Sequence, residues 1–203
     1  MQALLFISKK IDRLNEIVGQ TISWALLAGV LICSGNALVR YGLNNSSNGW
    51  LEIQWYLFAA VFLLGAPYTL RRNEHVRIDV VTGRFSKRTQ VGIDLFGFIF
   101  FLLPITALIL YLGIPYAWHS IQNQEMSSNA GGLIVWPAKL LIPLGFLLML
   151  MQGFSEIIKR IAFLRGLIDA SAFEKKMTTP EEDIADLKSH IEANPTNQKG
   201  DAV

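Results

Sequence analysis

The chain is poor in the residues that build most active sites. Its 203 residues include one cysteine and three histidines, and 17% are charged, whereas a soluble domain carries about 25%. The single cysteine, Cys33, lies inside an apolar run, so there is no disulfide framework, CxxC redox motif or thiolate metal site. We interpret it as a small helix-packing residue. The net charge of +2 is too small to indicate nucleic acid as a partner.

The short motifs of phosphate, zinc and acyl chemistry are also missing. The sequence contains no GxGxxG, GxxxxGK[ST], HExxH or GxSxG pattern, so a phosphate cradle, a zinc hydrolase and a nucleophile elbow have no support. His75 and His119 lie at opposite ends of one long apolar run and His190 lies near the C-terminus. This separation excludes a bis-histidine haem site. We therefore expect no enzyme activity, no cofactor and no metal.

Apolar sequence is what the chain has in excess, with 52% hydrophobic residues and a mean hydropathy of +0.37. A helix that crosses a membrane needs about 20 mostly apolar residues. Four segments meet this requirement, about 17–39, 50–70, 89–113 and 137–158. The first is too long for a cleaved signal peptide and follows a polar lead. We predict an all-α integral membrane protein with four transmembrane helices, a membrane domain at 1–165 and a polar, mobile tail at 166–203.

Lysine and arginine are segregated between the two sides of the predicted membrane. In the short flanks of the spans, twelve lie in the lead, the second connection and the start of the tail, and two lie in the other connections. The twelve are Lys9, Lys10, Arg13, Arg71, Arg72, Arg77, Arg84, Lys87, Arg88, Lys159, Arg160 and Arg165, and the two are Arg40 and Lys139. Because cytoplasmic flanks carry the positive excess, we expect an N-in/C-in orientation.

Two segments outside the spans are expected to be helical at the inner surface. The lead has apolar residues at alternating spacings of three and four, which is typical of an amphipathic helix on the membrane surface or on a partner. An inward extension of the first spanning helix is the alternative. In the second connection, residues 76–82 are interpreted as a short interfacial helix, and Ser86 is expected to cap the third span.

Charged residues lie near the ends of the spans and not at their centres. A central charge costs about 2.5–3.5 kcal/mol even on the lenient insertion scale. Glu52 and Lys139 fall near the outer face, and Asp94 and Glu156 near the inner face. We expect Asp94 and Glu156 to pair with arginines such as Arg71, Arg72 or Arg160, and coupling to a partner is the alternative. Since the middles of the spans are apolar, this chain alone offers no proton or cation route.

The outer connection, predicted at 114–136, contains no lysine or arginine, and Glu125 is its only formal charge. Pro115 and Trp136 mark its membrane edges, and the stretch containing Gly131 and Gly132 predicts a turn or a flexible loop. A surface that docks a partner and a solvated loop both fit this pattern. Within the spans, Pro104 and Pro143 predict local kinks.

Three stretches together resemble a known family. They are YLFAAVFLLGAPYTLRRNEHVRIDV, IDLFGFIFFLLP and AGGLIVWPAKLLIPLGFLLMLMQGFSEIIKRI. They resemble the DctQ-like small membrane subunit of tripartite ATP-independent periplasmic (TRAP) transporters over about residues 10–165. The most specific part is the motif with Arg72, His75, Arg77 and Asp79 after the second span. His75 and Asp79 have metal-like spacing, but the surrounding arginines favour a hydrogen-bonded pair.

The resemblance implies a transport function that the residues alone do not give. Similar proteins form a complex in the bacterial inner membrane with a large DctM-like permease subunit, and a periplasmic binding protein delivers a carboxylate-bearing solute. The small subunit is then a scaffold in uptake driven by a cation gradient. The alternative is a membrane anchoring or assembly protein with a basic cytoplasmic loop.

Ten residues are candidates for a partner or lipid interface or a structural motif. They are Arg71, Arg72, His75, Arg77, Asp79, Asp94, Glu125, Trp136, Lys139 and Glu156. The expected partners are the large subunit, the binding protein and membrane lipids.

Overall fold

A computed structural model describes residues 1–43, 47–72 and 85–169. These residues form the helices α1 (Gln2–Gly42), α2 (Asn48–Arg71), α4 (Lys87–Gly97), α5 (Leu103–Gln122) and α6 (Trp136–Leu164), with a π-helical turn η1 (Phe98–Leu102) between α4 and α5. Within these ranges there is no strand, and Met126 and Ile134 form an isolated bridge. The interfacial helix predicted at 76–82 lies outside the described residues.

Four helical segments are long and apolar enough to cross a membrane. They are Gln2–Gly42, Asn48–Arg71, Lys87–Gln122 and Trp136–Leu164. Each of the four predicted spans lies within one of them, so the predicted number of spans is confirmed. Ser86 is the N-cap of α4, and its hydroxyl accepts a hydrogen bond from the Thr89 amide at 3.3 Å. The predicted cap is therefore also confirmed.

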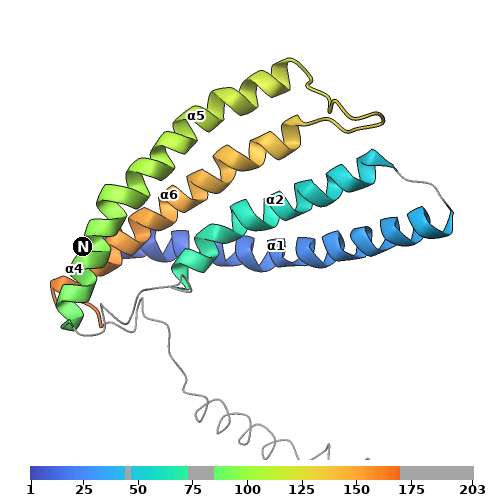
Figure 1. The fold of residues 1–203 in the computed structure, drawn as a ribbon. Coiled ribbons are helices and arrows are strands. Elements are labelled where there is room, and N and C mark those ends of the chain that lie inside the picture. Colours follow the sequence, from blue (N-terminus) through green and yellow to red (C-terminus); the bar gives the residue numbers. More distant parts are fainter. Residues whose placement is uncertain (44–46, 73–84, 170–203) are drawn as a thin grey trace, which may run out of the picture.

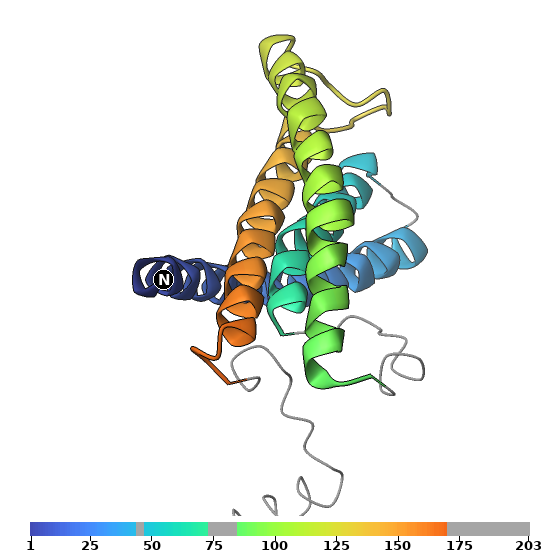
Figure 2. The same cartoon turned by 90° about the vertical axis from the view of Figure 1, so that its left-hand side faces the viewer.

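The helices lie side by side in the order α1, α2, α6 and α5, with α1 and α5 outermost (Figure 1). α1 also contacts α6 and crosses it at an angle (Figure 2). The outer surface carries many exposed large apolar side chains, such as Phe6, Trp24 and Phe62. By contrast, the largest fully buried side chains include Arg160, Gln152 and Glu156. This inverted pattern suits a bundle whose surroundings are lipid or other apolar helices.

Small residues allow the helices to approach closely. A Cβ atom built on Gly145 of α6 would lie 2.7 Å from the carbonyl oxygen of Leu63 in α2. A Cβ on Gly113 of α5 would lie 3.3 Å from the Ile142 side chain of α6. Since apolar side chains gain little by leaving lipid, this close backbone contact is what holds spanning helices together.

The lead is continuous with the first span. α1 is one helix of 41 residues, about 62 Å long at 1.5 Å per residue, compared with about 30 Å for a hydrocarbon core. The lead could be a separate amphipathic helix or an inward extension of the first span. In the structure it has the form of an extension. Part of α1 must lie outside the hydrocarbon core or the helix must be strongly tilted.

The third spanning segment is longer than predicted. The sequence places its end at residue 113 and a membrane edge at Pro115, but α5 continues through Pro115 to Gln122. The helix thus continues beyond the predicted span, because a proline inside a helix removes one hydrogen bond without ending the helix. Pro104 has a clearer local effect, because it lies two residues after the π-helical turn and the carbonyl four residues before it belongs to Phe100 within that turn. The proline ring excludes the carbonyl four residues earlier, so the helix widens there.

Candidate functional site

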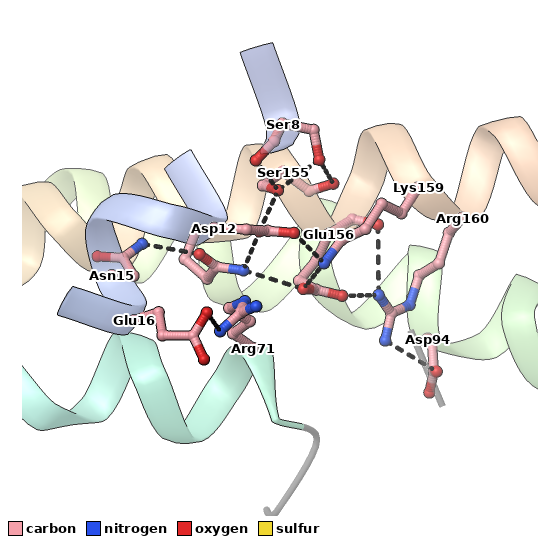
Figure 3. A network of polar contacts seen from close by, with 11 residues as sticks. Ser8, Asp12, Asn15, Glu16, Arg71, Asp94, Ser155, Glu156, Lys159 and Arg160 are labelled. Atoms are coloured by element: carbon pink, nitrogen blue, oxygen red, sulfur yellow. Dashed lines mark hydrogen bonds and ion pairs between the residues drawn. The ribbon is translucent and has the colours of Figure 1, made fainter. Parts of the chain in front are cut away.

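A cluster of polar and charged side chains joins α1 to α6 near the N-terminal end of α1 (Figure 3). We call it the α1/α6 polar cluster. Its members are Ser8, Asp12 and Asn15 of α1, Gln152, Ser155, Glu156, Lys159 and Arg160 of α6, and Asp94 of α4. The α1 residues are three or four apart, and the α6 residues recur at 152, 155–156 and 159–160, so those of each helix lie on one side of it.

Uncharged side chains and the carboxylate of Asp12 make one half of the cluster. The Asn15 amide donates to Gln152 Oε1 at 2.7 Å, and the hydroxyls of Ser8 and Ser155 lie 2.6 Å apart. Asp12 Oδ1 accepts from Ser155 Oγ at 2.7 Å and from Gln152 Nε2 at 2.9 Å. Each of these bonds connects α1 to α6. They fix the rotation of the two helices against each other, because an unpaired polar group there would be costly.

Charged side chains make the other half. Glu156 binds Lys159 through Oε1 and Arg160 through Oε2, each at 2.5 Å. Lys159 also contacts Asp12 at 3.1 Å, and Arg160 contacts Asp94 at 3.4 Å. The side chains of Glu156 and Arg160 are only 2% and 1% exposed. Buried charges are tolerated when each has an opposite partner, and this row of alternating charges supplies one for every member.

The structure brings Asp94 and Glu156 to Arg160, one of the three arginines considered for them. Arg71 instead binds Glu16 of α1 at 2.9 Å, and the Arg72 guanidinium lies 5.0 Å from the centre of the Tyr68 ring. The candidates His75, Arg77 and Asp79 lie outside the described residues.

Sequence reasoning missed Asp12, Gln152 and Lys159 as members of the cluster. Lys159 entered the sequence analysis only as one of the twelve basic residues that indicate orientation. The available signal was the three-to-four residue spacing of polar side chains on both segments, since that spacing places them on one face of each helix.

A second group of contacts holds the α5–α6 loop, residues 123–135, on the start of α2. Glu52 of α2 is buried and accepts hydrogen bonds from Asn129 Nδ2 at 2.9 Å, from the Leu133 amide at 2.6 Å and from the Ser127 hydroxyl. Asn48 Nδ2 donates to the Ala130 carbonyl at 2.8 Å. Glu52 therefore connects the loop to α2 and does more than anchor a helix end.

The backbone conformation and close packing of this loop require glycine at two positions. Gly131 has a φ of +71°, which favours glycine. A Cβ on Gly132 would lie 2.8 Å from Glu52 Oε1. The sequence leaves open a turn or a flexible loop, and the structure shows an ordered turn because the carboxylate of Glu52 gathers three donors from it.

Replacing Glu52 with glutamine is expected to release this loop from α2. Glutamine keeps the volume but places an NH2 group among donors that need an acceptor. The Leu133 amide should then lose hydrogen-exchange protection by about tenfold or more, while amides in the middle of α5 keep theirs. Glu16→Gln is the matched control, because it makes the same chemical change in a carboxylate that binds Arg71 and does not contact this loop. Unchanged protection of Leu133 would contradict the role given to Glu52.

Glu125, Lys139 and Trp136 lie where the loop meets α6. Lys139 Nζ contacts Glu125 Oε2 at 2.5 Å and lies 4.3 Å from the centre of the Tyr116 ring. The hydrogen bond from the Lys139 ammonium holds the pKa of the Glu125 carboxyl below its ordinary value of 4.5. Trp136 begins α6 and is half-buried. These residues form a partly exposed anchor for the loop.

The Glu125 pair makes loop stability depend on pH. Because the pKa is depressed in the folded state, the stabilising effect is present above the ordinary value of 4.5 and is lost as pH falls through the folded-state pKa. Thermal unfolding in detergent should therefore show a higher melting temperature for the wild type than for Glu125→Gln at pH 7. The difference should shrink as pH falls below 4.5 and vanish once the pH lies below the folded-state pKa of Glu125. If the two melting temperatures still differ at low pH, the effect of the substitution comes from side-chain packing and not from the charge of Glu125.

In the described part of the chain, no group of three or more histidine, cysteine, aspartate or glutamate residues could hold a metal ion. The charged side chains of the α1/α6 polar cluster bind one another. Its chemistry is that of a structural joint between helices.

The family comparison agrees with this membrane architecture. The family described as Tripartite ATP-independent periplasmic transporters, DctQ component, matches residues 13–163. The match includes most of all four spanning segments and every described residue of the ten candidates, and Ser8 and Asp12 of the α1/α6 polar cluster lie before it. No curated protein matches the chain. The chain therefore belongs to the DctQ family and is the small membrane subunit of a TRAP transporter, a multi-pass inner-membrane protein of a system that also uses a DctM subunit and a periplasmic binding protein.

Proposed function

We propose that this subunit is a scaffold that fixes the large permease subunit in the bilayer during uptake of a carboxylate-type organic solute. The solute is delivered by the periplasmic binding protein, and a cation gradient drives its uptake. The N- and C-termini lie in the cytoplasm, consistent with twelve basic residues in the inner flanks and two in the outer flanks.

The α1/α6 polar cluster carries the proposal. Its charges are paired with one another, and it joins helices of the same chain instead of lining a route across the membrane. A transporter that moved ions through this chain would need ionisable groups facing a path at membrane depth. A rigid bundle with an apolar exterior suits a stationary support, since the exposed faces of α1 and α5 provide a large area for contact with another membrane protein.

The proposal is tested by purification and reconstitution. A tagged chain expressed with its whole transport system should co-purify the large subunit. Proteoliposomes that hold both subunits should then take up solute only when the binding protein and an inward sodium gradient are present. Omitting this subunit should lower the rate without changing which solute is taken up. Transport by this chain alone, or a change of substrate preference on omitting it, would overturn the scaffold function.

A further inference from the structure

A groove of about 630 Å³ opens between α1, α2 and α6. Its lining includes Gly19 and Ser23 of α1, Gly65 and Tyr68 of α2, and Gly145 and Met149 of α6. The volume is in the range of ordinary ligand sites, about 300–1,000 Å³. Gly65 leaves this space, because a Cβ there would meet no atom within 4 Å, whereas Gly19 and Gly145 let α1 and α6 approach α2 closely.

The walls of the groove offer apolar contact and little hydrogen bonding. The Ser23 hydroxyl donates to the Gly19 carbonyl at 2.8 Å, and the Thr69 hydroxyl donates to the Gly65 carbonyl at 3.2 Å. Both hydroxyls are thus used within their own helices. A hydrocarbon chain fits such walls better than a polar solute, which would lose its hydrogen bonds to water without replacement.

Positive charge lies at one end of the groove. Tyr68 is a lining residue, and the Arg72 guanidinium lies 5.0 Å from the centre of its ring. Arg71 is the neighbouring residue, and its charge is balanced by Glu16 at 2.9 Å. Basic groups beside a pocket between spanning helices attract lipid head groups. An apolar groove that ends at an arginine therefore matches a molecule with a hydrocarbon chain and an anionic phosphate.

We propose that the groove binds one acyl chain of an anionic phospholipid and that Arg72 contacts its phosphate. Gly65 of α2 makes room for the chain, and the end of the same helix supplies the charge. This site is distinct from the α1/α6 polar cluster, and the proposal does not depend on the scaffold function.

Gly65 offers a way to fill the groove without moving a helix. A Cβ on Gly65 would meet no atom within 4 Å, so leucine at this position occupies the groove itself. Gly97→Leu is the matched control, because a Cβ on Gly97 also meets nothing within 4 Å and Gly97 does not line the groove. Circular dichroism and thermal unfolding of both variants verify that they fold.

The experiment measures phosphatidylglycerol retained by the full-length chain. Each protein is reconstituted in vesicles of equal parts phosphatidylglycerol and phosphatidylcholine, extracted in mild detergent, and examined by native mass spectrometry. Gly65→Leu should retain about tenfold less phosphatidylglycerol than the wild type, as expected for loss of about two methylene contacts, and Gly97→Leu should match the wild type. Equal retention by Gly65→Leu and the wild type would overturn the proposal.

The head-group contact is tested separately. Arg72→Gln should reduce the preference for phosphatidylglycerol over phosphatidylcholine about fivefold, whereas Arg40→Gln, at the opposite end of the bundle, should not. An unchanged preference in Arg72→Gln would overturn the assignment of Arg72. If Gly65→Leu instead lowers recovery of the large subunit and leaves lipid retention unchanged, the groove takes a protein helix and the lipid proposal is wrong. In that case the scaffold function still stands, because it rests on co-purification and uptake.

Discussion

Replacing Glu156 with glutamine is expected to lower the free energy of unfolding by about 3 kcal/mol, the cost of breaking a buried ion pair by removing one partner. The two Glu156 oxygens bind Lys159 and Arg160, each at 2.5 Å. Glutamine has the same shape but no charge, so it leaves the two cations with Asp12 and Asp94 at the longer distances of 3.1 and 3.4 Å. Contacts between α1 and α6 should weaken first, because Lys159 of α6 binds both Glu156 of the same helix and Asp12 of α1.

The measurement is unfolding in mixed detergent micelles, followed by the loss of helical circular dichroism as the denaturing detergent is increased. Glu16→Gln is the matched control, since it makes the same chemical change in an ion pair whose side chains are 25% and 35% exposed. Exposed pairs typically contribute about 0–1 kcal/mol. Equal effects of the two variants would show that burial does not raise the importance of the Glu156 contacts.

Replacing Gly145 with alanine is expected to destabilise the contact between α2 and α6 by about 2 kcal/mol, in the range observed when extra methyl groups are forced into packed interiors. The new Cβ would lie 2.7 Å from the Leu63 carbonyl oxygen and 2.9 Å from the Leu63 Cβ. The carbonyl belongs to a helical backbone, so a side-chain rotation cannot relieve the clash. The two helices must move apart and lose dispersion contacts along their interface.

The control for Gly145→Ala is Gly65→Ala. Both glycines lie in spanning helices and line the same groove, but a Cβ on Gly65 meets no atom within 4 Å. Alanine is more favourable than glycine inside a helix by up to about 1 kcal/mol, so this variant should be as stable as the wild type or more stable. The same unfolding assay should give opposite signs for the two substitutions. A gain in stability for Gly145→Ala would mean that the helices are not held at this contact.

The spanning segments and one helix start could be predicted from the sequence, because hydropathy and helix capping both depend on residues that are close together in the chain. The four apolar segments and the cap at Ser86 are of this kind. The end of α5 at Gln122 was not predicted, because Pro115 and the aromatic residues near it resemble a membrane edge whether or not the helix continues.

The α1/α6 polar cluster depends instead on which faces of two distant helices meet. Asn15 and Gln152 are 137 residues apart in the chain, and no local pattern fixes the rotation of either helix. The Glu52 contacts are similar, since the Leu133 amide reaches Glu52 only if the loop turns at Gly131. Charged residues near the span ends made these regions candidate sites. The residues that bind them could be identified only from the packed structure.

The π-helical turn at Phe98–Leu102 has a consequence for how the family can vary in length. This turn contains one more residue than a regular helical path, and each residue rotates an α-helix by about 100°. Deleting one residue there would leave a continuous helix but would rotate Asp94 away from Arg160 while Gly113 stays against Ile142. Natural relatives that are one residue shorter in this segment should therefore also lack the acid at the position of Asp94. The deletion and the loss of the ion pair should occur in the same sequences.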